Sequence, residues 1–362
     1  MRLTVFLPSL AGGGAERSMG IVANGLAERG VEVDLVLAQA CGPFLDEVSS
    51  RVRIVDLGRS SVVTAVPGLA RHLRKTQPHA LLAAMSHANV AAAMAHRLAR
   101  SRARLVLSER SHFSSILREY RNLRMGLTRQ LMRLTYPLAD RIVAVSEGVA
   151  HDLARHLGSS ERIETIYSPV VTPSLAQLAA HEPTHRWLRQ RVSPVVLAAG
   201  RLIPEKEFST LLEAFAMLRR QRPAKLVILG EGELRDALVA QAGRLGVAGD
   251  IDLPGFDPNP YSAMRHCDVF VLSSRYEGLP GVLIQAMACG ARVVSTDCPS
   301  GPREVLEGGR WGRLVPVADA AALARAIGEA LDDEHPPEVQ SRAAAFSADA
   351  ALAAYARALG LA

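Results

Sequence analysis

A loop that carries one carboxylate and two glycines interrupts an apolar stretch in the second half of the chain. The run DVFVLSS, residues 268–274, is typical of a buried strand, and an apolar helical pattern begins after the loop at 275–281. Open α/β sheets bind ligands where a strand gives way to a helix, whose first N–H groups have no partner within the helix. We therefore expect Glu277, on the loop, and Gln285, eight residues later on the helix, to reach one elongated ligand. The glycines allow that ligand to approach the backbone closely.

A second polar turn, residues 200–206, follows the first strand of the same half and carries Arg201 and Lys206. A guanidinium group can bind two phosphate oxygens at once and an ammonium group can neutralise another, so the pair matches a diphosphate. The alternative is a solvated loop whose cations pair with Glu205 or Glu207. The chain has only three lysines among its 42 basic residues, and one of them in this turn favours a functional role.

A glycine turn near the start of the chain, residues 12–16 (Gly-Gly-Gly-Ala-Glu), could hold a phosphate or a substrate at a helix N-terminus, or could be only a tight turn. It departs from the dinucleotide-binding pattern G-x-G-x-x-G, because Arg17 stands at the last glycine position. No acidic residue follows the second strand to bind a ribose. A nicotinamide-dependent oxidoreductase is therefore disfavoured.

Two further candidates have plain structural alternatives. Asp250 and Asp252 form D-x-D, a spacing that can hold a divalent metal beneath a diphosphate, but their position favours the polar start of a short strand. His112 follows a buried strand of the first half, where a ligand is expected, yet a lone histidine there is as often structural. We expect no metal site.

The elements that must position these residues form two similar series. The chain has 362 residues, 49% hydrophobic and 22% charged, enough for two folded domains. Short apolar strands alternate with helical patterns, which predicts an α/β fold with two Rossmann-like domains and parallel sheets. The expected strands are 3–8, 31–38, 52–57, 80–85, 105–108 and 141–146, then 195–199, 225–229, 251–253, 268–273, 292–296 and 312–315.

The domain boundaries follow from the same patterns. We expect an N-terminal domain at 1–170, a proline-rich interdomain linker at 171–194 and a C-terminal domain at 195–340. A last helix within 341–362 begins near Ser347 and can pack at several places, the first domain among them.

The net charge of +6 comes almost wholly from arginine. It suits an acidic surface or a phosphorylated ligand, although the base composition of a genome can also raise the arginine content. The four cysteines show no metal-binding or disulfide spacing, which favours a reducing cytoplasm. The N-terminal residues indicate a strand and not a signal peptide, and no run approaches the ~20 apolar residues of a membrane span.

Residues 100–141 contain ten arginines and three acidic residues. Within them, residues 113–134 show a helical apolar stripe with arginines between. Such a helix can lie on an anionic membrane, where each cation near the surface contributes ~1 kcal/mol. The alternative is a helix packed on the first sheet with solvated arginines. The apolar positions are 113, 116, 117, 120, 123, 127, 131 and 134.

Five motifs occur in order along nearly the whole chain. They are Gly13-Gly14-Ala15-Glu16, the turn from Gly200-Arg201-Leu202 to Lys206, Leu253-Pro254-Gly255-Phe256, Glu277-Gly278-Leu279-Pro280 through Ala286-Met287-Ala288-Cys289-Gly290, and Thr296-Asp297 through Gly301-Pro302-Arg303-Glu304. Each motif alone is weak. Together they resemble the retaining glycosyltransferases of family 4, which have the GT-B fold of two Rossmann-like domains facing a central cleft.

The resemblance implies a sugar nucleotide held mainly by the C-terminal domain and an acceptor held mainly by the N-terminal domain. The two cations of the 200–206 turn would bind the diphosphate and stabilise the leaving group, and the carboxylate of the 275–281 loop would contact the sugar hydroxyls. A histidine would lie near the transferred sugar. The implied catalytic residues are Glu277, Arg201, Lys206 and His112, and the implied substrate-binding residues are Gly13, Gly14, Glu16, Phe256, Gly278, Leu279, Pro280, Gly281, Val282 and Gln285.

One position departs from the family. The second glutamate of its motif, which accepts hydrogen bonds from the ribose, is Gln285 here. An amide oxygen can accept the same bonds, but without the charge that strengthens them. We therefore expect weaker ribose binding and retained activity.

The residues and the resemblance together imply a cytoplasmic, metal-independent glycosyltransferase without a cofactor, and the resemblance implies that it is retaining. Its donor is expected to be a nucleotide diphosphate sugar, with UDP favoured, and its acceptor a glycan or lipid-linked saccharide in cell-surface polysaccharide or lipopolysaccharide synthesis. Anionic membrane at the inner face is the expected partner of the arginine-rich region 100–141; nucleic acid is not an expected partner. The alternatives are a GT-B sugar-nucleotide epimerase and a non-catalytic sugar-nucleotide-binding protein.

Overall fold

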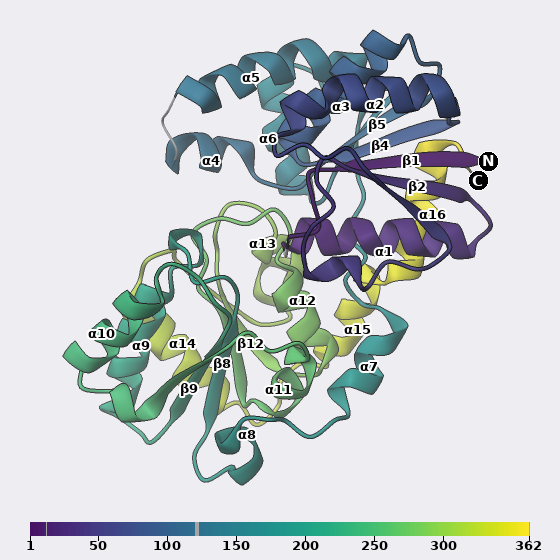
Figure 1. Cartoon of the computed structure of the whole chain (residues 1–362). Helices are drawn as coiled ribbons and strands as arrows, with labels where there is room; N and C mark the ends of the chain where they lie inside the picture. The colour runs from purple at the N-terminus through teal and green to yellow at the C-terminus, as the bar shows by residue number, and fades with distance from the viewer. Residues whose placement is uncertain (12, 120–122, 362) are drawn as a thin grey trace. The chain divides into compact units, whose positions relative to one another are not determined.

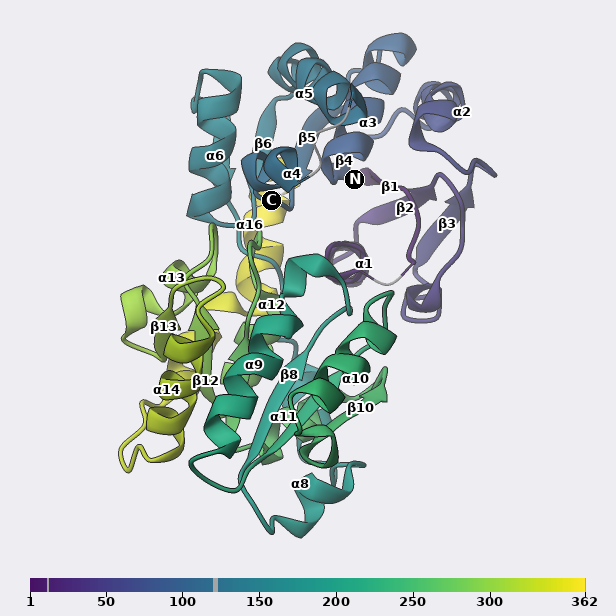
Figure 2. The same cartoon turned by 90° about the vertical axis from the view of Figure 1, so that its left-hand side faces the viewer.

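The computed structural model describes residues 1–11, 13–119 and 123–361. The chain forms two compact units, of which the first contains Met1–Pro169 and Ala348–Ala362 and the second Val170–Ser347. Each unit is built around one parallel sheet with helices packed on it (Figure 1, Figure 2). Within the described ranges, no helix is both long and apolar enough to cross a membrane.

The first unit contains a seven-stranded parallel sheet in the order β3-β2-β1-β4-β5-β6-β7. Its central strands are runs of leucine, valine and alanine that are buried along most of their length, because helices cover both faces. The prediction of six strands is confirmed, whereas β7 was missed because three residues are too few to show a pattern. The strands are β1 (Arg2–Leu7), β2 (Glu32–Leu37), β3 (Val52–Asp56), β4 (Ala80–Ala84), β5 (Arg104–Glu109), β6 (Arg141–Ala144) and β7 (Ile163–Thr165).

Two layers of helices enclose this sheet. Along β1, Phe6 packs with α2, α3 and α5 on one face, while Val5 and Leu7 pack with α1 and α16 on the other, as alternating strand side chains must. In the first layer α3 lies between α2 and α5 (Figure 1, Figure 2). The helices are α1 (Gly14–Glu28), α2 (Val62–Thr76), α3 (Ser86–Ala99), α4 (Phe113–Glu119), α5 (Leu123–Thr135), α6 (Glu147–Leu157) and α16 (Ala348–Leu359), with short 3-10 turns η1 (Pro43–Leu45) and η2 (Tyr136–Leu138).

The last helix, α16, packs against α1 in the first unit. A Cβ atom added to Gly25 would stand 2.4 Å from Cδ1 of Leu352, so the absence of a side chain permits this close approach. Arg104 Nε donates to the carbonyl oxygen of Ala358 at 2.7 Å, and the Tyr355 side chain is fully buried. The chain therefore returns to the first unit after completing the second, which is one of the packings that the sequence left open.

The second unit contains a six-stranded parallel sheet in the order β10-β9-β8-β11-β12-β13. All six strands were predicted. They are β8 (Val195–Ala199), β9 (Lys225–Leu229), β10 (Ile251–Gly255), β11 (Val269–Leu272), β12 (Arg292–Thr296) and β13 (Arg313–Val315). The helices are α7 (Pro173–Ala179), α8 (Arg186–Gln190), α9 (Phe208–Arg219), α10 (Arg235–Arg244), α11 (Pro260–His266), α12 (Gly281–Ala288), α13 (Pro302–Val305), α14 (Ala320–Leu331) and α15 (Val339–Ala343), with 3-10 turns η3 (Pro204–Lys206), η4 (Ala248–Asp250), η5 (Glu307–Gly309) and η6 (Ala344–Phe346).

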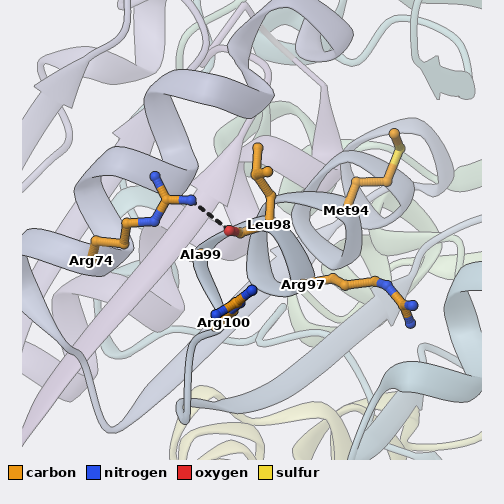
Figure 3. A pocket seen from close by; sticks show the side chains of 6 residues that line it. All are labelled: Arg74, Met94, Arg97, Leu98, Ala99 and Arg100. Carbon is orange, nitrogen blue, oxygen red and sulfur yellow. Dashed lines mark hydrogen bonds between the residues drawn. The ribbon is translucent and has the colours of Figure 1, made fainter.

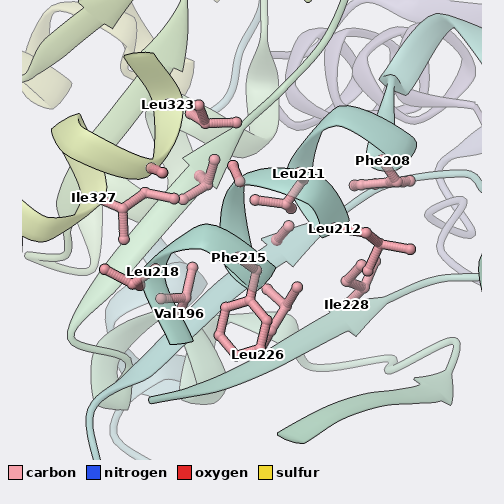
Figure 4. Packing of buried hydrophobic residues seen from close by; sticks show 14 of the residues in the cluster. Val196, Phe208, Leu211, Leu212, Phe215, Leu218, Leu226, Ile228, Leu323 and Ile327 are labelled. Carbon is pink, nitrogen blue, oxygen red and sulfur yellow. The ribbon is translucent and has the colours of Figure 1, made fainter. Parts of the chain in front are cut away.

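The main core of this unit lies between the sheet and the neighbouring helices α9 and α14. Phe215 and Leu211 of α9 pack over Leu226 and Val196 of the sheet, and Ile327 of α14 completes the layer (Figure 4). All of these side chains are buried. The core holds the sheet rigid, so the loops at the carboxyl ends of its strands have fixed starting points.

The segment 171–194, predicted as an interdomain linker, is part of the second unit. It contains α7 and α8, and Asn259 Nδ2 donates to the carbonyl oxygen of Leu178 at 2.9 Å. Pro173 stands in the first turn of α7, where its missing N–H removes no hydrogen bond, and so starts a helix instead of breaking one. The second unit also extends to Ser347 instead of residue 340, and the last helix begins at Ala348.

The single helix predicted at 113–134 is wrong. The described residues form α4 and α5, and Tyr120 of the predicted stripe lies outside the described residues. Leu127 and Leu134 are 57% and 71% exposed, whereas Met132 is fully buried against the sheet. One periodicity was extended over two helices, and the second helix, α5, turns a different face to the core than that periodicity implies.

Candidate active site

The carboxyl ends of β8 and β11 meet at the point where the strand order of the second sheet reverses direction. Parallel α/β sheets bind their ligands at such a point, because the two following loops leave on opposite sides. Here the loops are joined: the N–H of Arg275 donates to the carbonyl oxygen of Glu205 at 2.8 Å, and Ser273 Oγ donates to that of Lys206 at 2.7 Å. The two turns singled out in the sequence therefore lie side by side.

Lys206 lies between two carboxylates of these loops. Its Nζ atom is 2.8 Å from Oε1 of Glu277 and 2.8 Å from Oε1 of Glu205. Burial alone would lower the pKa of Lys206, but the charges of Glu277 and Glu205 outweigh it and hold the pKa above its usual value. The ammonium group is therefore charged at neutral pH, with one N–H left to donate after both ion pairs are made.

Glu277 is 9% exposed and is held from two sides. Its Oε1 atom accepts from Lys206 Nζ at 2.8 Å and from Ser274 Oγ at 2.7 Å, and its N–H donates to the carbonyl oxygen of Pro299 at 3.2 Å. A carboxylate with two fixed partners is a rigid acceptor for hydroxyl groups.

Arg201 stands in the same turn but makes no contact with this pair. Its side chain is exposed and has no carboxylate partner in the described part of the chain. The aliphatic part of Lys206 packs over Gly200, where an added Cβ would meet its Cγ at 3.6 Å. One ion pair of the alternative interpretation exists, since Lys206 binds Glu205 at 2.8 Å, whereas Glu207 binds Arg275, outside the turn, at 3.0 Å. Arg201 is thus the cation of the turn that is open to a ligand.

The N-terminus of α12 follows Glu277 directly. The N–H groups of Gly281 and Val282, in its first turn, have no backbone partner within the described ranges, as expected at a helix start. The preceding loop is braced from behind, because Ser300 Oγ donates to the carbonyl oxygen of Gly278 at 3.0 Å and Gly301 packs against Pro280. Gly281 and Val282 thus offer two N–H donors in a fixed position.

Gln285 lies one turn further along α12 and is half-buried. Its Nε2 atom is 3.4 Å from Oη of Tyr261 on α11, so its amide oxygen points elsewhere and can accept a bond. Phe256, which follows β10, is 69% exposed. Gln285 and Phe256 make no contact with Glu277.

A set of glycines that sequence reasoning missed lies beside this turn. A Cβ on Gly230 would stand 2.0 Å from the carbonyl oxygen of Gly200, and one on Gly232 would stand 2.5 Å from that of Leu202. The N–H of Gly230 also donates to the carbonyl oxygen of Gly255 at 2.8 Å. The signal was present as a G-x-G spacing directly after β9. These glycines let the ends of β8, β9 and β10 approach one another.

The glycine turn of the first unit behaves differently from a phosphate cradle. Gly13 is the N-cap of α1, and an added Cβ would stand 2.2 Å from Oε2 of Glu16. Gly14 is the first residue of the helix, and Gly12 lies outside the described residues. The carboxylate of Glu16 therefore already faces the positive end of the helix, which is where a phosphate would sit.

His112 is 7% exposed, within the first unit. Its Nδ1 lies 2.9 Å from Oγ of Ser115, and its Nε2 lies 3.7 Å from Oδ1 of Asp152. Burial lowers the pKa of His112, with Asp152 as a partial offset, so the ring is neutral at pH 7. Both ring nitrogens face protein groups, which fits the structural alternative.

The D-x-D pair is the start of a strand, as predicted. Asp250 binds Arg219 and Lys225, each at 2.7 Å, and Asp252 Oδ2 lies 3.0 Å from Nε2 of His185. Among the described residues, no group of three or more His, Cys, Asp or Glu side chains is arranged to hold a metal ion.

A buried carboxylate of the first unit was also missed. Glu109, at the carboxyl end of β5, is 1% exposed and accepts from Tyr136 Oη at 2.7 Å and from Ser86 Oγ at 3.1 Å. Burial raises the pKa of Glu109. Unlike the neighbouring His112, Glu109 was not predicted as a candidate, because a lone glutamate at the end of a strand carries no spacing signal.

Two family models match the chain. "Glycosyltransferase Family 4" covers residues 12–173, and "Glycosyl transferases group 1" covers residues 186–347. A relative from Campylobacter jejuni, N-acetylgalactosamine-N,N'-diacetylbacillosaminyl-diphospho-undecaprenol 4-alpha-N-acetylgalactosaminyltransferase, is 29% identical over 95% of both chains. The lipopolysaccharide core biosynthesis glycosyltransferase LpsE of Rhizobium meliloti is 29% identical over 89% of this chain and 86% of its own.

Solved structures share the fold. The crystal structure of Anabaena Alr3699/HepE in complex with UDP-glucose superposes with a TM-score of 0.81 at 21% identity and covers 99% of both chains. The apo form of the lipopolysaccharide outer core galactosyltransferase WaaB superposes with a TM-score of 0.73 at 18% identity, again over 99% of both chains. At these identities the likeness concerns the fold.

Proposed function

Because the chain belongs to the group 1, family 4 glycosyltransferases and has their GT-B fold, we propose that it moves a sugar from a UDP-sugar to a glycan or lipid-linked saccharide, with retention of configuration. The observation that carries the proposal is the ion pair between Lys206 and Glu277 at the switch point of the second sheet. It joins the two loops that must hold the diphosphate and the sugar. Retention is carried over from the family.

The cations of the 200–206 turn stabilise the leaving group. As the bond between the sugar and the diphosphate breaks, negative charge grows on the diphosphate, and cations already in place stabilise it without reorganising. Lys206 is fixed and charged, and Arg201 is exposed and free of carboxylates among the described residues. Two such groups can do the work of a divalent ion, so the proposal includes no metal and no other cofactor.

The 275–285 segment binds the sugar and the nucleoside. Glu277 accepts hydrogen bonds from sugar hydroxyls, while the free N–H groups at the start of α12 donate to the sugar or the phosphates. The amide oxygen of Gln285 accepts from the ribose, and the backbone at Phe256 lies by the base. These roles follow the family's order of motifs.

The first unit binds the acceptor. Gly13, Gly14 and Glu16 at the start of α1 follow the carboxyl end of β1, which lies between β2 and β4 in that sheet. The carboxylate of Glu16 is an acceptor for a hydroxyl group of the incoming saccharide. His112 is neutral, and the role that the family gives it near the transferred sugar requires one ring nitrogen to leave Ser115 or Asp152.

The acceptor belongs to cell-surface polysaccharide or lipopolysaccharide synthesis in this proposal. The named relatives from Campylobacter jejuni and Rhizobium meliloti act on a lipid-linked saccharide and in lipopolysaccharide core biosynthesis by their names. The protein then works on the cytoplasmic face of the membrane, with the arginine-rich region 100–141 against anionic lipid. These relatives are transferases, which favours transfer over the epimerase and the non-catalytic binding protein.

A panel of nucleotide sugars tests the donor. A donor that binds only the folded state raises the melting temperature, by RT ln(1 + [L]/Kd) in free energy, and slow hydrolysis without an acceptor reports turnover. We expect UDP-sugars to act and GDP- and ADP-sugars to act weakly. If only GDP-sugars raised the melting temperature, the donor would be a GDP-sugar and not a UDP-sugar.

A variant of Glu277 tests transfer itself. Glu277→Ala should lower turnover by on the order of 10²-fold, since the sugar loses its orientation, while UDP still stabilises the protein. Glu334→Ala, at an exposed glutamate of the same unit, is the control and should change neither. Unchanged turnover in Glu277→Ala would contradict the assigned role, and donor turnover without any acceptor product would favour the epimerase.

A further inference from the structure

Three neighbouring helices of the first unit carry no acidic residue. No aspartate or glutamate occurs anywhere in residues 57–108, which include α2 and α3, nor in α5. The two helices pack along one another, and α3 also packs on α5 (Figure 1). The stretch 57–108 carries eight basic residues, Arg59, Arg71, Arg74, Lys75, Arg97, Arg100, Arg102 and Arg104.

An open hollow of about 720 Å³ lies at the C-terminal end of α3, with one lining residue from α2. Its lining comes from both helices and joins cationic with apolar side chains (Figure 3). Arg74 Nη2 donates to the carbonyl oxygen of Leu98 at 2.6 Å, which ties one guanidinium group to the rim. The lining residues are Arg74, Met94, Arg97, Leu98, Ala99 and Arg100.

The plain explanation of these cations is that they neutralise the ends of the two helices. Each helix C-terminus carries roughly half a negative charge, so two ends account for about one cation. Four are present at this place, Arg74, Lys75, Arg97 and Arg100, and none has a carboxylate partner among the residues described. Roughly three positive charges are therefore left without a counter-charge, and helix capping does not explain them.

The same helices expose large apolar side chains. Met94 and Leu98 in the hollow are 43% and 51% exposed, and Leu127 and Leu134 on α5 are more exposed still. Half of the twelve exposed large apolar residues of the described chain stand on α2, α3, α5 and the adjoining η2. Uncompensated cations beside exposed apolar side chains match the boundary of a lipid layer, where phosphates lie next to acyl chains.

Two other ligands fit less well. A soluble anion would satisfy the arginines but would leave Met94 and Leu98 in water. A nucleic acid is bound by aromatic stacking as well as by charge, and no exposed large aromatic residue stands on these helices in the described ranges.

We propose that the surface around this hollow binds anionic phospholipids, with Arg74, Arg97 and Arg100 contacting headgroup phosphates from separate sides and Met94 and Leu98 entering the layer beneath them. This inference rests on one part of the proposed function, the contact with anionic membrane. It places that contact at the ends of α2 and α3 instead of the predicted helix at 113–134. It does not depend on sugar transfer.

The test is sedimentation of the full chain with vesicles at low salt. Vesicles of phosphatidylcholine with 30% phosphatidylglycerol should bind the protein, and vesicles of pure phosphatidylcholine should not. Each cation near an anionic surface contributes a roughly fivefold factor in partitioning, so the triple variant Arg74→Gln, Arg97→Gln, Arg100→Gln should lose about 100-fold. Leu98→Gln should weaken binding without a change in charge.

A matched control removes the same charge elsewhere. Arg220→Gln, Arg244→Gln and Arg325→Gln together change three exposed arginines of the second unit that have no ion-pair partner in the described ranges. This variant should bind vesicles within about threefold of the original chain. Equal losses in the two triple variants would overturn the proposal, since binding would then depend on net charge alone.

Soluble probes distinguish the other ligands. Inorganic phosphate or diphosphate at millimolar concentration should not displace the protein from vesicles beyond the effect of matched salt; full displacement would make this a soluble-anion site. Binding of polyuridylate that disappears in the hollow variant would make it a nucleic-acid surface. Thermal stabilisation by UDP should be equal in all variants, which checks folding. If the original chain hydrolyses the donor but does not bind vesicles, only the lipid site is contradicted. If it binds vesicles but does not hydrolyse the donor, only sugar transfer is contradicted.

Discussion

The Nζ atom of Lys206 and the Oε1 atom of Glu277 lie 2.8 Å apart although 71 positions separate the two residues in the chain. Both side chains are largely buried, so neither charge is balanced by water alone. Their separation in sequence means that the tertiary fold, and not the local chain, makes the pair. Changing one partner must therefore change the state of the other.

Lys206→Met should lower kcat/KM for the donor by about 10²–10³-fold, because a positive charge aimed at the leaving group is lost. The double variant Lys206→Met, Glu277→Gln should lose little more than either single variant, since residues in contact are not additive. Lys225→Met, which removes a lysine bound to Asp250, should keep full activity. Steady-state kinetics with a UDP-sugar measures Lys206→Met, Glu277→Gln, the double variant and Lys225→Met. If the losses of the two single variants added fully in the double variant, Lys206 and Glu277 would act independently.

Glu205→Gln should tighten the binding of UDP by about three- to tenfold. Glu205 pairs with Lys206 at 2.8 Å, and its negative charge opposes an incoming diphosphate. The variant keeps the shape of the side chain and leaves Glu277 as the partner of Lys206. Calorimetric titration with UDP checks this, with Glu334→Gln as the control; weaker binding would mean that Glu205 mainly holds Lys206 in position.

Gln285→Glu should strengthen nucleotide binding by roughly fivefold, because a hydrogen bond to a charged acceptor exceeds a neutral one by about 1 kcal/mol. The gain should appear with UDP and vanish with a UDP analogue that lacks both ribose hydroxyls. The Gln285 side chain contacts Tyr261 at 3.4 Å, so the carboxylate has a neighbour that can donate to it. An equal gain with the analogue would place the residue away from the ribose.

Gly230→Ala should destabilise the second unit by more than 2 kcal/mol and weaken UDP binding. Its φ of +133° is unfavourable for alanine, and the new Cβ would meet the carbonyl oxygen of Gly200 at 2.0 Å. Gly243→Ala, in α10 with open space around it, should instead stabilise the protein by up to about 1 kcal/mol. Urea unfolding of both variants measures the contrast.

The free energy of unfolding should fall as the pH falls below about 6.5. Burial lowers the pKa of His72, His112 and His156 in the folded chain. The unfolded chain therefore binds more protons in this window, which favours unfolding; above it both states are neutral and the contribution is flat. Urea unfolding from pH 5.5 to 8 gives the free energy of unfolding at each pH. Its dependence on pH should be weaker in His112→Asn than in the original chain and unchanged in His335→Asn. An equal slope in the original chain and His112→Asn would remove His112 from this account.

Much of the fold could be predicted because each strand is a short apolar run between polar turns, and that pattern is local. Leu3 to Leu7 and Val269 to Leu272 are found from their side chains alone. Ile163–Thr165 was missed because a strand this short is defined by its partner, β6. The stripe predicted at 113–134 failed because α4 and α5 are separate helices, and α5 buries Met132 while it exposes Leu127.

The candidate site divides in the same way. The residue types of the 200–206 and 275–281 turns indicated chemistry for phosphate and sugar, since cations, a carboxylate and glycines at loop positions are visible in one chain. Arg201 and Lys206 were expected to act alike, but the fold engages one in two ion pairs and leaves the other open. His112 was expected in a ligand site, and its burial against Ser115 and Asp152 was not foreseeable.

The sequence alone therefore determined the strands and helices, the parallel sheets and the types of residue that can do chemistry. These features depend on hydrophobic periodicity and turn residues, which act over a few neighbouring positions. The tertiary structure alone decided which charges meet, which are buried and which stay free: Lys206 with Glu277, Glu109 beneath Tyr136, and the arginines at the ends of α2 and α3. Electrostatic energy depends on distance and burial, and both arise only when segments far apart in the sequence pack together.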